Sequence, residues 1–305
     1  MSLAASAGVE IAVIPVAGLG TRMLPASKAI PKEMLPIMDK PMIQMVAEEA
    51  VRAGIRHIIF VTHMAKTAIE NHFDRNPELE DVLAEKGKQA LLQSVKDVLP
   101  AGVTFSAVRQ GAALGLGHAI ACARALVDGR SFAVLLPDVL IDCSGEDEDL
   151  GRMIRRHLET GAGQIMVTPV PRERVQDYGT VALSREEEGD EDDGALITGI
   201  VEKAPAAEAP SNLAVVGRYV FSAQIFPALE ALEPGVGGEM QLTDAIARQL
   251  QDEPLHAYLM QGQTFDCGSK LGWLEANLHF GLKHPECGKG LHALMARLCG
   301  ENDAS

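Results

Sequence analysis

The first half of the chain repeats one pattern, in which an apolar run of strand length is followed by a segment with helical spacing. The apolar runs are "IAVIPV" at 11–16, "RHIIFVT" at 56–62, "VTFSAVRQ" at 103–110, "SFAVLLPD" at 131–138 and "QIMVTPV" at 164–170. Helices are expected between them at 41–54, 66–74, 117–127 and 150–161, with more helical material at 75–100. For the helix at 41–54, Asp39 is the expected N-cap. This alternation predicts a doubly wound α/β fold, that is, a Rossmann-like, mixed, mostly parallel sheet with helices on both faces.

The second half is richer in strands. Strands are expected at 178–184, 196–203, 213–222 and 255–261, and helices at 239–251, 269–284 and 290–299. No long helix separates the first two strands, so we expect the two halves to share one sheet. The acidic run at 185–194 is expected to form a solvated hairpin or loop tip.

The loop after the first strand, "AGLGTRMLPASKAIPKEMLP" at 17–36, limits the kinds of nucleotide site that the chain can form. The dinucleotide fingerprint needs a third glycine three residues after the second, and Thr21, Arg22 and Met23 follow Gly20 instead. The Gly-Lys-Ser/Thr ending of the ATPase phosphate loop is also missing. The prolines prevent a continuous helix. The stretch is therefore interpreted as a strand, a glycine turn and an extended loop.

Composition narrows the class of protein. The 305 residues are 47% hydrophobic and 23% charged, as in ordinary globular proteins, and the net charge is -15. This charge argues against broad binding of nucleic acid or anionic membranes. The five cysteines show no zinc spacing, which favours reduced thiols and a cytoplasmic location. Residues 1–9 are expected to be a flexible leader, and no apolar run is long enough to span a membrane.

Reactive residues follow several of the expected strands. In open α/β sheets, ligands bind at the carboxyl ends of strands, so these loops are expected on one rim. Arg22 and Lys32 suit the phosphates of a nucleoside triphosphate. Asp138 and Asp266 suit Mg²⁺, although each could instead be a cap or turn residue. Gln110 carries the donor and acceptor needed to pair with uracil or thymine, although backbone groups could also satisfy its amide.

A longer series of motifs points to a family. "AGLGTRMLPASKAIPKEMLP", "DKPMIQ", "THMAKTAIENHFD", "VRQGAALGLGHAI", "LLPDV", "IVEK", "PSNLAVVGRYVFS", "EMQLTDAI" and "FDCGSKLG" occur in this order between about Glu10 and His284. In these motifs the chain resembles the bacterial UTP–glucose-1-phosphate uridylyltransferases (UDP-glucose pyrophosphorylases) of the sugar-nucleotidyltransferase superfamily. The resemblance implies the nucleotide-diphospho-sugar transferase fold and the conversion of UTP and glucose 1-phosphate to UDP-glucose and pyrophosphate, with Mg²⁺ as cofactor.

The resemblance also implies roles for individual residues. Arg22, Lys32 and Lys203 are the implied catalytic residues, with Lys203 on the phosphate of glucose 1-phosphate. The implied nucleotide-binding residues are Ala17, Gly18, Gly20, Glu33, Gln110 and Gly115. The implied sugar-binding residues are Gly179, Glu202 and Gly217. Asp138 and Asp266 are the implied Mg²⁺ ligands.

The implied organisation is one catalytic domain at 10–285, with a nucleotide half at about 10–170 and a sugar-binding half at about 171–270, followed by a C-terminal helix and tail at 286–305. A homotetramer is also implied. Two departures from the family pattern are visible. Ala204 stands where proline usually follows the lysine of "VEK", and the acidic run at 186–193 is longer than expected. Two other functions remain open, a thymidylyltransferase on the same fold and a non-catalytic homologue that senses sugar nucleotides.

Overall fold

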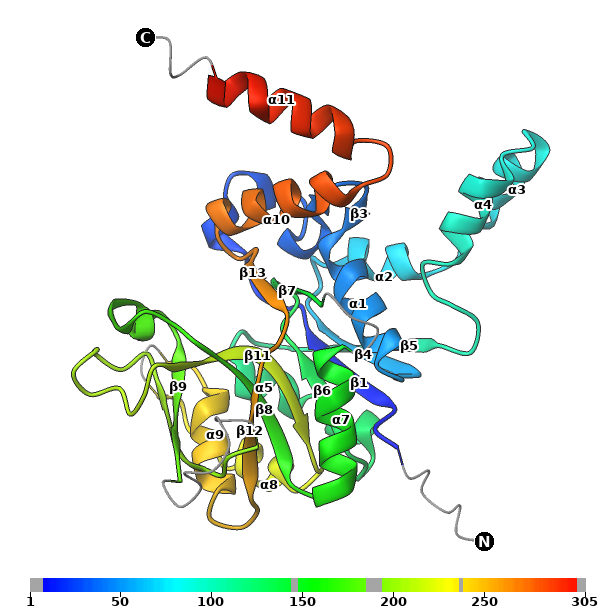
Figure 1. Cartoon of the computed structure of the whole chain (residues 1–305). Coiled ribbons are helices and arrows are strands. Elements are labelled where there is room, and N and C mark those ends of the chain that lie inside the picture. The colour runs from blue at the N-terminus through cyan, green and yellow to red at the C-terminus, as the bar shows by residue number, and fades with distance from the viewer. Residues whose placement is uncertain (1–7, 144–147, 185–193, 236–237, 301–305) are drawn as a thin grey trace, which may run out of the picture.

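The structure is a computed structural model that describes residues 8–143, 148–184, 194–235 and 238–300 (Figure 1). The acidic run at 186–193 and most of the expected leader lie outside these residues. A nine-stranded sheet forms the centre of the molecule, with the strand order β10-β9-β11-β6-β1-β4-β5, while β8 pairs with β11 and β12 pairs with β8. Its strands are β1 (Ile11–Pro15), β4 (His57–Thr62), β5 (Thr104–Arg109), β6 (Phe132–Leu135), β8 (Gly163–Pro169), β9 (Gly179–Leu183), β10 (Ile197–Glu202), β11 (Leu213–Phe221) and β12 (Leu255–Leu259).

The sheet is mixed and mostly parallel, as predicted. Strands β1, β4, β5 and β6 are mutually parallel, and only β10 and β11 run against the other strands of this sheet. Strand β11 joins the two halves of the chain because it pairs with β6 on one side and with β8 and β9 on the other. The expectation that both halves share one sheet is therefore confirmed.

Helices cover both faces of the sheet, and the strands supply apolar side chains to each side. One buried cluster joins the sheet to α1 (Met42–Arg52), α2 (Thr67–Phe73) and α7 (Asp149–Thr160). The other joins it to α5 (Leu116–Ala121), α6 (Arg124–Val127), α8 (Ile225–Glu230) and α9 (Leu242–Gln249). Strands that are buried on both faces consist almost entirely of apolar residues, which is why "SFAVLLPD" lacks polar alternation.

Several smaller elements lie outside these two layers. Helices α3 (Pro77–Glu85) and α4 (Gln89–Lys96) pack on each other as a hairpin that stands away from the body (Figure 1). Helices α10 (Lys270–Lys283) and α11 (Gly288–Gly300) are the last two elements in the sequence, and they pack on each other. Short 3₁₀ turns η1 (Thr21–Met23), η2 (Ala26–Lys28), η3 (Lys32–Met34) and η4 (Arg172–Asp177) shape two loops. Among the described residues, none of the helices is both long enough and apolar enough to cross a membrane.

Two local predictions were wrong, and one small sheet was not foreseen. Asp39 does not cap α1, because the chain first forms a small hairpin of β2 (Pro36–Ile37) and β3 (Lys40–Pro41), and Pro41 is the N-cap. The helix expected at 117–127 is divided into α5 and α6 at Cys122 and Ala123. A two-stranded sheet of β7 (Val139–Asp142) and β13 (Gln263–Asp266) was not foreseen.

Candidate active site

A cleft of about 830 Å³ opens beside the carboxyl end of β6, and it brings together residues from distant parts of the chain. Its lining includes the predicted site residues Arg22, Asp138, Gly179, Glu202, Lys203, Gly217 and Asp266. The other predicted residues, Ala17, Gly18, Gly20, Lys32, Glu33, Gln110 and Gly115, lie on or beside the loops that follow β1 and β5. Because β1, β5 and β6 are parallel, those loops share one edge of the sheet.

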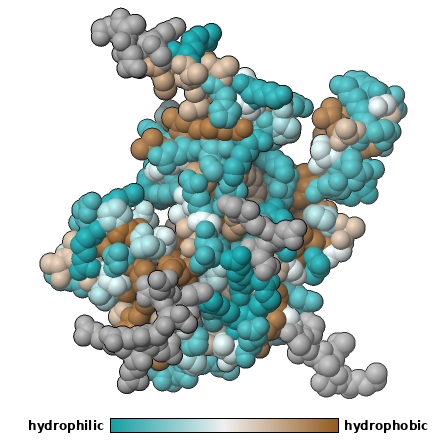
Figure 2. All heavy atoms as spheres, in the orientation of Figure 1, coloured by the Kyte–Doolittle hydropathy of each residue, from teal (hydrophilic) through white to brown (hydrophobic). Residues whose placement is uncertain are grey.

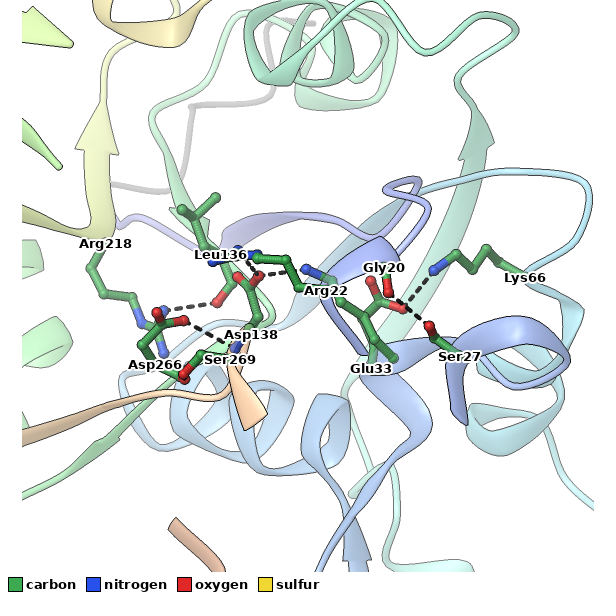
Figure 3. A network of polar contacts seen from close by, with 12 residues as sticks. Gly20, Arg22, Ser27, Glu33, Lys66, Leu136, Asp138, Arg218, Asp266 and Ser269 are labelled. Carbon is green, nitrogen blue, oxygen red and sulfur yellow. Dashed lines mark hydrogen bonds and ion pairs between the residues drawn. The ribbon is translucent and has the colours of Figure 1, made fainter. Parts of the chain in front are cut away.

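Two cations from the glycine loop meet the carboxylate of Asp138. Lys32 Nζ donates a hydrogen bond of 2.5 Å to Asp138 Oδ2, and Arg22 Nη2 lies 3.9 Å from the same oxygen (Figure 3). Burial alone would raise the pKa of Asp138, but the charge and hydrogen bond of Lys32, together with the charge of Arg22, hold that pKa below its ordinary value. Asp138 is therefore an ionised carboxylate at neutral pH.

Asp266 reaches the same place through the small sheet that the sequence did not reveal. Strand β13 pairs antiparallel with β7, which sets Asp266 opposite Val139, and Cys267 N donates to Asp138 O at 2.8 Å. Two carboxylates that are 128 positions apart in the sequence thus lie on adjacent strands and loops. The burial of Cys267 and the nearby carboxylates of Asp266 and Asp138 raise the pKa of its thiol to about 12.

Gly268 marks the point on which the charged groups converge. A Cβ atom added to this glycine would lie 2.8 Å from Arg22 Nη2 and 2.9 Å from both Asp138 Oδ2 and Asp266 Oδ1. The two carboxylate oxygens are therefore no more than twice 2.9 Å apart. The space between them is free because residue 268 is a glycine, and any side chain there would occupy it. Mg²⁺ is usually bound by one or two carboxylates together with phosphate oxygens and water, so this arrangement fits the predicted ion.

The described residues contain no larger set of ligands for a metal ion. Among those residues, no group of three or more His, Cys, Asp or Glu side chains is placed to hold a metal ion. An ion held by Asp138 and Asp266 would accordingly take its other ligands from phosphate and water rather than from a closed protein cage.

The glycine loop is braced from within. Gly20 has a φ of 66° and packs against the Cβ of Lys32, so a side chain at this position would be strained as well as crowded. Ser27 Oγ donates to Gly20 O at 2.7 Å (Figure 3). Glu33, predicted to bind nucleotide, is fully buried and accepts a 2.7 Å hydrogen bond from Lys66. Burial raises the pKa of Glu33, although the charge of Lys66 opposes the shift. This side chain ties the loop to the start of α2.

The predicted base-binding end lies after β5. Gln110 is buried, and its Nε2 donates to Gly115 O at 3.1 Å and lies 3.0 Å from His118 Nδ1. Gly115 has a φ of 101°, and a Cβ there would lie 2.8 Å from the backbone of Met240. Its glycine is therefore required by both conformation and space. The backbone thus satisfies part of the Gln110 amide, which was the structural alternative foreseen for it.

The predicted sugar-binding residues lie at the other end of the cleft. Glu202 ends β10 opposite Gly179, and its Oε2 would lie 3.1 Å from a Cβ built at Gly179. Because "IVEK" ends an expected strand, Glu202 and Lys203 were also expected on the parallel rim, but β10 runs antiparallel to β9, so this loop reaches the cleft from a reversed strand. Lys203 has a φ of 46°, and its Nζ lies 3.6 Å from Glu202 Oε1. Gly217, with a φ of 88°, packs closely on Leu136.

The structure adds residues that the sequence did not single out. Arg174, Tyr178 and Thr243 line the cleft together with the predicted sugar-binding residues, and Arg174 Nη2 donates to Tyr178 Oη at 2.9 Å. Two more residues belong to the charged region described above. Gly268 leaves room for the charged groups around it, and Lys66 pairs with Glu33. The sequence carried one signal for Gly268. A glycine two residues after Asp266 has no side chain, so the backbone there can approach the carboxylate closely. No spacing rule would have linked Lys66 to Glu33.

The comparisons with known proteins show which family the chain belongs to. The model of the nucleotidyl transferase family matches residues 11–281, so the chain belongs to that family. It is 54% identical to the UTP–glucose-1-phosphate uridylyltransferase of Haemophilus influenzae over 94% of this chain and 98% of that protein. It is 49% identical to the enzyme of the same name from Escherichia coli K12, over 96% and 97% of the two chains. Within the family, the chain groups with the UTP–glucose-1-phosphate uridylyltransferases.

Solved structures support the same assignment. The UTP-bound UGPase from Acinetobacter baumannii superposes with a TM-score of 0.89 at 50% identity, covering 95% of this chain and 99% of that one. A UDP-glucose pyrophosphorylase complexed with UDP-glucose gives a TM-score of 0.81 at 36% identity, covering 90% of this chain and 100% of that one. The predicted family and fold class are therefore confirmed.

Proposed function

We propose that this chain transfers the uridylyl group of UTP to α-D-glucose 1-phosphate, giving UDP-glucose and pyrophosphate. The observation that carries the proposal is the convergence of Arg22, Asp138 and Asp266 on Gly268, in the cleft that also holds Lys203. The relatives of 49–54% identity carry the name of this activity, and solved neighbours are titled as bound to UTP or UDP-glucose. The proposal includes a cytoplasmic location, where unpaired thiols such as the five of this chain persist.

The reaction needs little acid–base chemistry. A phosphate oxygen of glucose 1-phosphate attacks the α-phosphorus of UTP, a new P–O bond forms, and the bond to the β-phosphate breaks with its electron pair leaving on pyrophosphate. The nucleophile is already anionic, so the barrier comes from repulsion between two polyanions and from charge on the leaving group. Arg22 and Lys32 offset the charge of the triphosphate, and Lys203 holds the sugar phosphate in line.

Asp138 and Asp266 are the residues that would hold Mg²⁺. When bound, such an ion supplies positive charge to phosphate oxygens and helps to fix their geometry. The chain's own part is to keep Asp138 ionised through the cations around it, and to leave both carboxylates facing one point, which the bare backbone of Gly268 allows. At the opposite end of the cleft, Glu202 is placed to accept hydrogen bonds from sugar hydroxyls beside Gly179 and Gly217.

The two rival functions are less well supported. Uracil and thymine differ by one methyl group, and the neighbour titled a putative glucose-1-phosphate thymidylyltransferase, at 21% identity and a TM-score of 0.65, shares the fold alone. A sugar-nucleotide sensor without activity has no need for Arg22, Lys32, Asp138 and Lys203 together, and the chain retains all four.

One assay tests the proposal directly. UTP, dTTP, ATP, CTP and GTP are each incubated with glucose 1-phosphate and Mg²⁺, and pyrophosphate release is followed. We expect UTP to give the highest kcat/KM. A preference for dTTP would identify the thymidylyltransferase, and binding of UDP-glucose without turnover of any triphosphate would identify the sensor.

A further inference from the structure

Arg218 is a charged residue inside an otherwise apolar strand. It lies in β11 with 0% of its surface exposed, and it is among the largest fully buried side chains of the described residues. Its guanidinium forms a two-pronged contact with Glu49 of α1, in which Nε donates to Oε1 at 2.8 Å and Nη2 donates to Oε2 at 2.7 Å. Arginine is almost never fully buried unless it is paired, so this position requires an explanation.

The remaining donors of Arg218 point to the turn that carries Asp138. Nη1 donates to Leu136 O at 3.1 Å, and Nη2 donates to Val139 O at 2.7 Å. These two carbonyl groups flank the short segment between β6 and β7 that carries Asp138, the proposed metal ligand. Figure 3 shows Arg218 reaching Leu136 on the side of the turn away from Arg22.

The same turn connects both ends of the cleft. Leu136 N donates to Gly217 O at 2.9 Å, which joins the turn to the sugar-binding strand next to Arg218. Cys267 N donates to Asp138 O at 2.8 Å, which joins it to the loop of Asp266. Arg218 therefore binds a segment that meets both the proposed metal ligands and the proposed sugar site.

Stability alone is a weak explanation for such a pair. Removing two charges from water is costly, and apolar residues of similar volume often replace a buried ion pair with no loss of stability. What apolar residues lack is a set of directed donors. An arginine fork, held rigid by Glu49, fixes the positions of two carbonyl oxygens in a way that packing does not.

We infer that Arg218, oriented by Glu49, is a positioning residue that fixes the Leu136–Val139 turn and thereby aims the Asp138 carboxylate at the metal-binding point beside Gly268. The inference rests on the proposed function for the role of Asp138. Its structural part, the ordering of the turn by Arg218, does not depend on that role.

The test uses the full chain with both partners replaced by apolar residues, as Arg218→Met with Glu49→Met, so that no buried charge is left alone. Arg218→Lys is the second variant, since it keeps the charge opposite Glu49 but loses the fork, and it serves if the double variant fails to fold. Tyr258→Phe is the matched control, because it removes a buried hydrogen bond of 2.8 Å to Asp149 that does not touch the turn.

Two readouts are independent of turnover, namely amide hydrogen exchange over 136–142 and 267, and the affinity for Mn²⁺ in the presence of UTP. In the Arg218 variants we expect faster exchange at these amides, Mn²⁺ binding weakened roughly 10–100-fold, and a thermal midpoint close to that of the wild type. Turnover should fall with Mn²⁺ affinity and recover in part at high Mg²⁺. The control should match the wild type in amide exchange over the turn, in Mn²⁺ affinity and in turnover, although loss of a buried hydrogen bond should lower its thermal midpoint.

The outcomes separate the two proposals. A folded Arg218 variant with wild-type exchange over the turn and wild-type Mn²⁺ affinity would overturn the inference and leave Arg218 a structural residue. If Arg218 variants loosen the turn while Asp138→Asn binds Mn²⁺ like the wild type, the positioning of the turn stands and the assignment of Asp138 as a metal ligand fails.

Discussion

At the residue scale, the first prediction concerns Gly268, which contributes space to the proposed metal site and not charge. In the variant Gly268→Ala, the added methyl group would occupy the point on which Arg22, Asp138 and Asp266 converge. The change should leave the fold intact and lower kcat by at least about a hundredfold, as for loss of a preorganised electrostatic contact. Gly290→Ala is the control, since a Cβ there meets nothing within 4 Å. Near-normal turnover by Gly268→Ala would show that the metal site lies elsewhere.

The two aspartates should behave as a unit. Asp138→Asn and Asp266→Asn keep the shape of the side chain but remove one negative charge, so each should fold normally and lose at least about a hundredfold in activity. Removing both should cost little more than removing one, because the ion would already be misplaced. EDTA should stop the wild type and added Mg²⁺ should restore it. Normal rates of the single variants at limiting Mg²⁺ would contradict the assignment.

Lys203 should act on the sugar phosphate and not on the nucleotide. Lys203→Ala removes an ammonium group whose loss should cost about 2–4 kcal/mol of transition-state stabilisation. We expect kcat/KM for glucose 1-phosphate to fall while UTP affinity, measured by calorimetry, changes little. Lys289→Ala, an exposed lysine on α11, is the control. A Lys203 variant that bound UTP poorly and used glucose 1-phosphate normally would reverse the assignment.

At the element scale, one carboxylate contributes to the docking of α10, beside the apolar contacts of Trp273 and Phe280. Asp142 of β7 accepts hydrogen bonds from His279 and Lys283 of α10, while the opposite end of this helix contributes Leu271, Gly272 and Glu275 to the cleft. Burial favours a raised pKa for Asp142, but the hydrogen bonds from Lys283 and His279 outweigh it and lower the pKa.

The sign of the pH dependence follows from that lowered pKa. The ionised Asp142 carboxylate stabilises the fold above the ordinary aspartate pKa of about 3.9. This stabilisation is lost as the pH falls through the lower pKa that Asp142 has in the folded state. Because the Lys283 side chain is 56% exposed, solvent screens part of this interaction, so Asp142→Asn should reduce the unfolding free energy by about 1 kcal/mol at neutral pH, with the difference vanishing in acid. Denaturant titrations from pH 7 to 2 measure this. A difference that stayed constant with pH would mean that packing, and not charge, holds α10.

The elements also show what the sequence could and could not predict. Apolar runs that end at Gly18, Gln110 and Asp138 predicted the parallel core strands and their shared edge, because burial on both faces leaves a direct mark on composition. Asp138 and Asp266 were paired from carboxylate chemistry and from the family resemblance, but the small sheet that brings them together was not predicted, since the four-residue strands β7 and β13 have no distinctive periodicity. Arg218 was visible as a charge within an apolar strand, but its partner Glu49 is 169 positions away, and no local rule connects them.

At the scale of the whole molecule, a net charge of -15 must be reconciled with two polyanionic substrates. At physiological salt, charges on the surface are screened beyond about 8 Å, so the distant acidic residues exert little force in the cleft. Lys32 lies against Asp138 with only 14% of its side chain exposed, where screening is weaker, and Arg22 and Lys203 line the cleft itself, within a few ångströms of any ligand bound there. Local placement, and not overall charge, decides which ligand the cleft favours.

The last prediction concerns assembly. We propose a homotetramer built from two dimers, and exposed leucines at the α10–α11 end of the molecule support a contact there. Leu271 and Leu274 of α10 are 67% and 49% exposed, and Leu294 and Leu298 of α11 are 40% and 54% exposed. Figure 2 shows apolar surface over this end of the molecule. Grouped apolar side chains on an otherwise charged surface mark interaction sites more often than isolated ones do.

Light scattering at micromolar concentration should give about four times the chain mass of 32.5 kDa. The variant Leu294→Lys with Leu298→Lys should shift the mass toward smaller species without lowering the helical content, because lysine is costly to bury in an apolar contact but tolerated on a free helix surface. Leu158→Lys on α7, where the leucine is 49% exposed, tests whether any exposed leucine has this effect. A mass near that of one chain for the wild type would refute the assembly. A tetramer unaffected by the α11 substitutions would place its contacts on another surface.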